Sequence, residues 1–212
     1  MKKSWWILLL LSIAIMLPFV IPYLTFNPAG SRIEISSRTL QYPALVGHIL
    51  LAMLAMLAGF LQFHRGIRQK NPALHARLGK TYVYAVFLSG GLALIVASYE
   101  PDFGRTLSFL FLDALWLITT AMGFRSAMKR DWKAHKQWMI RSFAMTLTAV
   151  SARALVPFLF LLYLLLHRFA LPEGRMEMIE EVLNNNIWAA IVVNFILVEW
   201  FILRPRREQP LL

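Results

Sequence analysis

The sequence predicts an all-α integral membrane protein with six transmembrane helices. Its 212 residues are 58% hydrophobic and only 16% charged, whereas an ordinary soluble domain is about half apolar and a quarter charged. The apolar residues gather in runs of roughly 20, the length of helix that spans a bilayer. These runs are apolar on every side rather than along one stripe, which argues against a soluble helical bundle. We therefore expect a single integral membrane domain over residues 1–212.

The first predicted span covers residues 5–26. It follows Lys2 and Lys3, and a basic start before an apolar run is also typical of a signal peptide. The run is too long for a signal peptide, and no small-residue cleavage site follows it. We therefore interpret it as an uncleaved helix, kinked at Pro18 and Pro22.

Five further spans follow, separated by short polar connections. They are expected at residues 44–62, 81–98, 107–124, 142–166 and 187–203. Gly90 and Gly91, inside the third span, predict a close helix contact because small residues let two backbones approach. Asn184-Asn-Asn186 is expected to cap the sixth span. Six spans place both termini on the same side of the membrane.

Positive charges indicate the orientation of these spans. Of the 22 Lys and Arg residues, sixteen lie in the two terminal segments and in two basic loops at 64–80 and 125–141. The opposite connections carry five. Because Lys and Arg are enriched in cytoplasmic loops, we expect both termini in the cytoplasm. The net charge of +11 then indicates contact with anionic lipid headgroups at the basic loops rather than with nucleic acid.

The two basic loops resemble each other. Each follows a Gly-Phe pair and contains a capping residue with a histidine four positions later: Asn71 with His75, and Asp131 with His135. Asn and Asp are favoured helix N-caps. The similarity predicts that spans two–three and four–five are parallel repeats, as in some transporters. The match is short, so coincidence is the alternative.

Four polar side chains fall inside the predicted spans at similar depths. At 1.5 Å per residue, Arg153 lies roughly 17 Å from the cytoplasmic side of a core about 30 Å thick. Asp113, Asn194 and His48 lie roughly 9, 11 and 6 Å from the outer side. Because an isolated charge is costly in hydrocarbon, we predict that Arg153 pairs with Asp113, with His48 and Asn194 nearby.

This predicted cluster has two interpretations. The functional one is an outward-facing polar pocket for binding or transport of a small molecule or ion, in which Arg153 contacts an anion or relays protons. The structural one is a buried ion pair that fixes the register of the helices. Glu199, nearer the cytoplasmic end of the sixth span, is expected either to extend toward the surface or to face Gln62.

Histidines suggest two further sites. His64, His75 and His135 lie near the predicted cytoplasmic surface, where they would either form a metal site with a carboxylate or lie among lipid headgroups. The second of these sites is one for haem b, because His48 and His64 lie at the two ends of the second span. Their counterparts near the fifth span, His135 and His167, are 32 residues apart, roughly 48 Å of helix. That length exceeds the membrane, so the pattern of a two-haem cytochrome fits poorly.

Catalytic signals are missing from the sequence. The chain has no cysteine, no nucleophile–base pair, no glycine-rich phosphate loop and no zinc-protease motif. We therefore expect a binding or transport protein rather than an enzyme. The alternatives are a redox membrane protein that uses haem or quinone, and a structural or assembly protein.

Several features between residues 44 and 153 form a characteristic set. They are His48, the segments Gly59-Phe-Leu-Gln-Phe63, His75-Ala-Arg-Leu-Gly-Lys-Thr-Tyr82 and His135-Lys-Gln-Trp-Met-Ile-Arg141-Ser142, and Arg153. In this set the chain resembles a bacterial family of polytopic membrane proteins with a domain of unknown function. The resemblance implies an inner-membrane helical architecture and assigns no activity.

Overall fold

The computed structural model describes residues 3–169, 171 and 174–203, and this part of the chain is helical with no strand. Lys2 and the predicted basic tail, Arg204–Leu212, lie outside the described residues. The helices are α1 (Lys3–Val20), α2 (Gln41–Gln62), α3 (Arg65–Lys70), α4 (Pro72–Ala97), α5 (Phe103–Met128), α6 (Trp132–Thr146), α7 (Thr148–Leu166) and α8 (Arg175–Ile196), with 3-10 turns η1 (Ile21–Thr25) and η2 (Pro28–Gly30) and a π-helical end η3 (Leu197–Ile202). Six helical segments are long and apolar enough to cross a membrane. The predicted fold class is thus confirmed.

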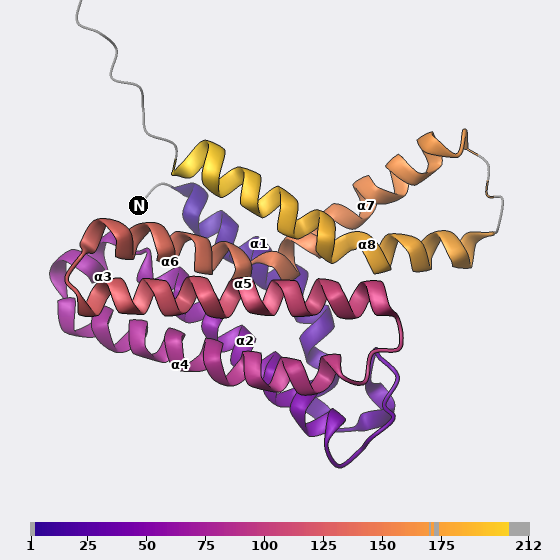
Figure 1. Ribbon diagram of the computed structural model, residues 1–212, viewed down its shortest axis with the longest axis horizontal. Helices are drawn as coiled ribbons and strands as arrows, with labels where there is room; N and C mark the ends of the chain where they lie inside the picture. Colours follow the sequence, from indigo (N-terminus) through magenta and orange to yellow (C-terminus); the bar gives the residue numbers. More distant parts are fainter. Residues whose placement is uncertain (1–2, 170, 172–173, 204–212) are drawn as a thin grey trace, which may run out of the picture.

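The helices pack mainly as neighbours along the chain. Helix α2 lies along α4, α5 lies along α6, and α4 joins the two pairs through α5. Helices α7 and α8 form a third hairpin, which diverges from the others toward its connecting turn (Figure 1). Helix α1 contacts α2 and α7. Each pair of the predicted repeat therefore forms a packed hairpin, while the repeat itself stays a prediction.

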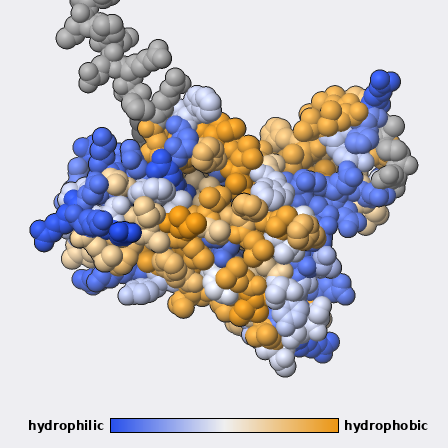
Figure 2. All heavy atoms as spheres, viewed as in Figure 1, coloured by the Kyte–Doolittle hydropathy of each residue, from blue (hydrophilic) through white to orange (hydrophobic). Residues whose placement is uncertain are grey.

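The surface is divided into a hydrophobic middle and hydrophilic ends. Figure 2 shows apolar residues across the centre of the viewed face, with hydrophilic residues gathered around α3 and the start of α6. Large apolar side chains such as Leu88, Ile118 and Phe158 are exposed. A soluble monomer rarely exposes so much contiguous apolar surface, so this belt is the surface that lipid covers in a multi-pass membrane protein. We refer to the hydrophilic end formed by α3 and the first turns of α4 and α6 as the basic end.

Two predicted caps define the basic end. Asn71 Oδ1 accepts from the Leu74 N–H at 2.9 Å, and Asp131 Oδ1 accepts from the Ala134 N–H at 3.0 Å. These side chains satisfy backbone donors that the first turn of a helix leaves free. Both N-cap predictions are confirmed. Helices α4 and α6 consequently begin well before the predicted spans 81–98 and 142–166.

The prediction of one continuous fifth span is wrong. The chain leaves the helical pattern at Leu147, between α6 and α7. The Ala144 carbonyl, which a continuous helix would use for the Thr148 N–H, accepts instead from Asn194 Nδ2 at 2.9 Å and from Thr148 Oγ1 at 3.3 Å. Side chains that occupy the helical acceptor explain the interruption.

Two smaller predictions are also corrected. Asn184–Asn186 does not cap a helix, because α8 begins at Arg175 and these residues lie inside it. Of the glycine pair, only Gly90 marks a close contact: a Cβ there would lie 2.8 Å from Leu117, whereas Gly91 has open space around it.

Candidate functional site

Arg153 does not pair with Asp113, so this prediction is wrong. The guanidinium of Arg153 lies over the ring of Phe19, with Cζ 5.0 Å from the ring centroid, and Nη1 donates to the Ala149 carbonyl at 3.1 Å. Arg153 therefore faces α1. Depth along a helix was predictable, but the direction in which α7 turns its side chains was not.

Asp113 and His48 both approach α4 instead. Asp113 is buried on α5, beside Gly90, and its Oδ1 has no hydrogen-bond partner among the described residues. His48 Nδ1 lies 3.0 Å from Ser89 Oγ and 3.1 Å from the Ser89 carbonyl oxygen. The structure thus brings these two residues to adjacent positions of α4 without joining them.

Asn194 forms a separate polar contact between α7 and α8. Its Oδ1 accepts from Ser151 Oγ at 2.8 Å, and its Nδ2 lies 3.2 Å from Thr148 Oγ1. Both contacts are beside the break at Leu147. The predicted four-residue cluster is therefore divided among three places.

A buried hydroxyl network joins α4, α5 and α6, and the sequence did not predict it. Tyr82 Oη lies 2.7 Å from both Ser142 Oγ and Thr146 Oγ1. Thr146 Oγ1 also accepts from Trp116 Nε1 at 2.8 Å, and Thr120 Oγ1 lies 2.6 Å from Ser142 Oγ. Hydroxyl side chains within apolar runs are the only sequence signal of such a network. Its members satisfy one another, so it holds three helices together inside the membrane core.

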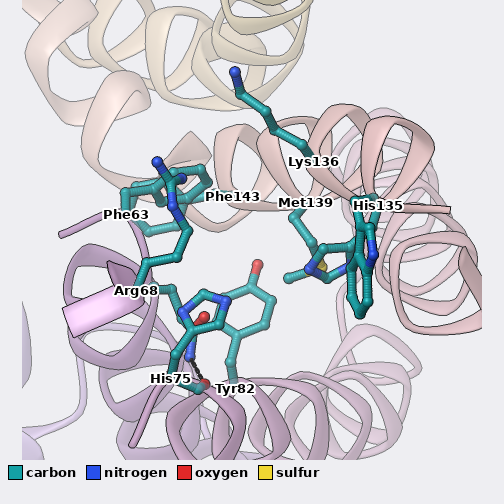
Figure 3. Close-up of a pocket in the computed structure, with 11 residues that line it drawn as sticks. Phe63, Arg68, His75, Tyr82, His135, Lys136, Met139 and Phe143 are labelled. Atoms are coloured by element: carbon teal, nitrogen blue, oxygen red, sulfur yellow. Dashed lines mark hydrogen bonds between the residues drawn. The ribbon is translucent and has the colours of Figure 1, made fainter. Parts of the chain in front are cut away.

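A cavity of about 400 Å³ opens beside this network at the basic end. Its lining comes from α2, α3, α4 and α6 and consists of Gly59, Gln62, Phe63, Arg68, His75, Tyr82, Trp132, His135, Lys136, Met139 and Phe143. Figure 3 shows Tyr82 directed into the middle of this space, with His75 and His135 on opposite sides. A cavity of this size, with apolar walls and a few polar groups, is typical of a small-molecule site.

The two cavity histidines differ in how their rings are held. His135 Nδ1 lies 2.9 Å from the Gly123 carbonyl oxygen. Because a carbonyl only accepts, this contact places the proton on Nδ1 and leaves Nε2 of a neutral ring as an acceptor. Helix α4 is fixed beside the cavity by Gln62 Nε2, which donates to the His75 carbonyl at 2.5 Å. The His75 Nδ1 is buried and has no partner within the described residues.

His64 is separate from these two residues. Its Nδ1 accepts from the Ile67 N–H at 3.2 Å and so caps α3, and its ring lies near Trp6. In the described part of the chain no group of three His, Asp or Glu side chains is arranged to hold a metal ion. The predicted three-histidine site therefore reduces to the pair His75 and His135.

Glu199 has a partner that the sequence did not predict. It accepts from Arg141 Nε at 2.5 Å and from Nη2 at 3.0 Å, joining α6 to η3. The hydrogen bond to Glu199 raises the pKa of Arg141 above its ordinary value. The guanidinium also lies over the Trp138 ring, 4.8 Å from its centroid. Glu199 therefore neither extends alone to the surface nor faces Gln62.

Comparison with known protein families gives one match. Residues 45–202 match the model of a family described as predicted membrane protein, DUF2306. The chain belongs to this family. No curated protein and no solved structure matches the chain. The DUF2306 region runs from α2 to η3, so it contains every residue that lines the cavity and leaves α1 outside.

Proposed function

We propose that this DUF2306 protein binds an amphipathic small molecule, with an apolar body and an anionic head, in the cavity at the basic end. The observation that carries the proposal is the cavity lining. Phe63, Tyr82, Met139 and Phe143 offer an apolar surface, and no carboxylate side chain contributes to it. Aromatic walls bury flat apolar groups well, which suits the proposed ligand body.

The charged lining residues support an anionic head. Arg68 and Lys136 extend away from the Tyr82 hydroxyl in Figure 3, and both are exposed to solvent. Cations at the mouth of a low-dielectric cavity attract and orient an anion. Given the orientation that the positive-inside rule predicts, the cavity opens on the cytoplasmic side of a bacterial inner membrane.

Thermal unfolding of purified protein in a neutral detergent tests the proposal. We expect naphthalene-1-sulfonate to raise the Tm more than its uncharged analogue 1-naphthalenemethanol, because only the former has an anionic head. Arg68→Gln should weaken the apparent affinity for the sulfonate about two- to fivefold, the range of an exposed ionic contact. Arg65→Gln is the matched control, since Arg65 is an exposed cation on the same helix that does not line the cavity. Equal shifts with both naphthalenes, or equal losses in both variants, would refute the anionic-head assignment.

A second candidate is haem b bound between His75 and His135. The specific observation is that these imidazoles come from different helices, line one cavity, and each keep a ring nitrogen with no hydrogen-bond partner among the described residues. Paired imidazoles with basic residues for the propionates would suit a haem, which supplies one-electron transfer when bound. A Soret band with split α and β peaks on reduction, lost in both His75→Ala and His135→Ala, would support haem. A featureless visible spectrum after expression with haem supplied would exclude it.

A further inference from the structure

Two arginines converge on one aromatic ring at the end of the molecule away from α3. Arg153 Cζ lies 5.0 Å and Arg32 Cζ lies 4.8 Å from the centroid of the Phe19 ring. The two guanidinium groups are therefore at most about 10 Å apart. Arg153 comes from the first third of α7, and Arg32 comes from the connection that follows η2 (Figure 1).

Proline chemistry fixes Arg32 in this position. Pro22 has no N–H, so the Pro18 carbonyl four residues earlier lacks its helical donor. Arg32 Nη2 donates to that carbonyl at 2.9 Å. The backbone N–H of Arg32 donates to Tyr23 Oη at 3.1 Å, which holds the connection against the buried Tyr23 ring. The side chain is thus held at the end of α1 by two separate contacts.

Most of the donors in this pair are unused. A guanidinium has five N–H donors, and each of the two makes one hydrogen bond, to a backbone carbonyl. Within the described ranges neither forms an ion pair with a carboxylate. Like charges at this separation repel, and a half-buried guanidinium without a counter-ion is costly. An anion between the two would offset both effects.

We propose that Arg32 and Arg153, arranged around Phe19, bind a phosphate group. Planar guanidinium groups match the oxygens of phosphate, with two parallel N–H donors each. Arg32 is exposed and Arg153 is partly buried, so an anion can reach the pair from the protein surface. That position suits the phosphodiester of an anionic lipid as well as free phosphate. This site is distinct from the basic-end cavity and does not depend on the function proposed for it.

Ligand-dependent unfolding of the full chain tests the assignment. One arm compares sodium phosphate with sodium chloride at equal ionic strength in neutral detergent. The other compares nanodiscs of phosphatidylcholine with nanodiscs that contain phosphatidylglycerol. We expect stabilisation in at least one arm, and a loss of affinity of about tenfold or more in Arg32→Gln, because hydrogen bonds to charged groups contribute this much. Arg38→Gln is the control, since it removes one exposed charge from the same connection.

The arms separate the sources of the phosphate. Stabilisation by phosphate alone assigns a soluble anion, and stabilisation by phosphatidylglycerol alone assigns a lipid headgroup. Arg153→Gln should lose as much affinity as Arg32→Gln. If Arg153→Gln fails to fold, the variant at the exposed Arg32 still decides the outcome. The proposal is overturned if neither arm stabilises the wild type, or if Arg38→Gln loses as much as Arg32→Gln.

Discussion

Removing the hydroxyl of Tyr82 perturbs the centre of the helix packing with little change of shape. Tyr82 is 1% exposed, and its Oη lies 2.7 Å from Ser142 Oγ and 2.7 Å from Thr146 Oγ1. Tyr82→Phe therefore deletes contacts from α4 to α6 and leaves the ring in place. We expect this variant to be less stable than the wild type.

The structure limits the size of the effect. Ser142 keeps its contact with Thr120, and Thr146 keeps its hydrogen bond from Trp116. No hydroxyl is left entirely without a partner, so the full penalty of an unsatisfied buried group does not apply. The free energy of unfolding should fall by about 1–2 kcal/mol, the loss of one to two ordinary hydrogen bonds.

Unfolding by sodium dodecyl sulfate titrated into mixed micelles measures this difference. Tyr84→Phe is the control, because Tyr84 lies on the same helix and its side chain is 67% exposed. The control should unfold like the wild type. If Tyr82→Phe proves as stable as Tyr84→Phe, the hydroxyl network does not hold α4 to α6 and the reasoning fails.

Two further predictions concern packing and charge. In Gly59→Ala the new methyl group would overlap the Phe143 ring, so the free energy of unfolding should fall by about 1–3 kcal/mol. The sodium dodecyl sulfate titration measures this loss, and Gly91→Ala is the control. For the ion pair of Arg141 and Glu199, whose side chains are 26% and 29% exposed, a double-mutant cycle of the two Gln variants should give a coupling of about 0.2–1 kcal/mol.

Different results would contradict each of these two predictions. Stability of Gly59→Ala equal to that of Gly91→Ala would show that the helices do not approach at position 59. A coupling of zero between Arg141 and Glu199 would show that the contact does not contribute to the attachment of η3 to α6.

The sequence predicted the helices but not their faces. Long apolar runs and capping residues such as Asn71 and Asp131 act locally, so the six long apolar helices and two helix starts could be inferred. The partner of Arg153 depends on the rotation of α7 and on the path of the connection before α2. Those are set by tertiary packing, and one sequence does not reveal them.

The candidate site was predicted only in part. The spacing of Asn71 with His75 and of Asp131 with His135 singled out the two cavity histidines. It also included His64, which caps α3 instead. The cavity itself depends on a gap between helices that are distant in sequence. Composition and spacing do not encode such a gap, because it is defined by what the surrounding side chains leave unfilled.

The most direct test of ligand binding at the basic end uses the absence of cysteine from the chain. Met139→Cys places one thiol in the cavity lining, and mass spectrometry measures its alkylation by N-ethylmaleimide in detergent. Binding in the cavity predicts that the thiol reacts and that naphthalene-1-sulfonate slows the reaction. A control thiol from Phe158→Cys, on the apolar belt, should show no such slowing. An unchanged rate at position 139 would contradict the assignment of this cavity as a ligand site.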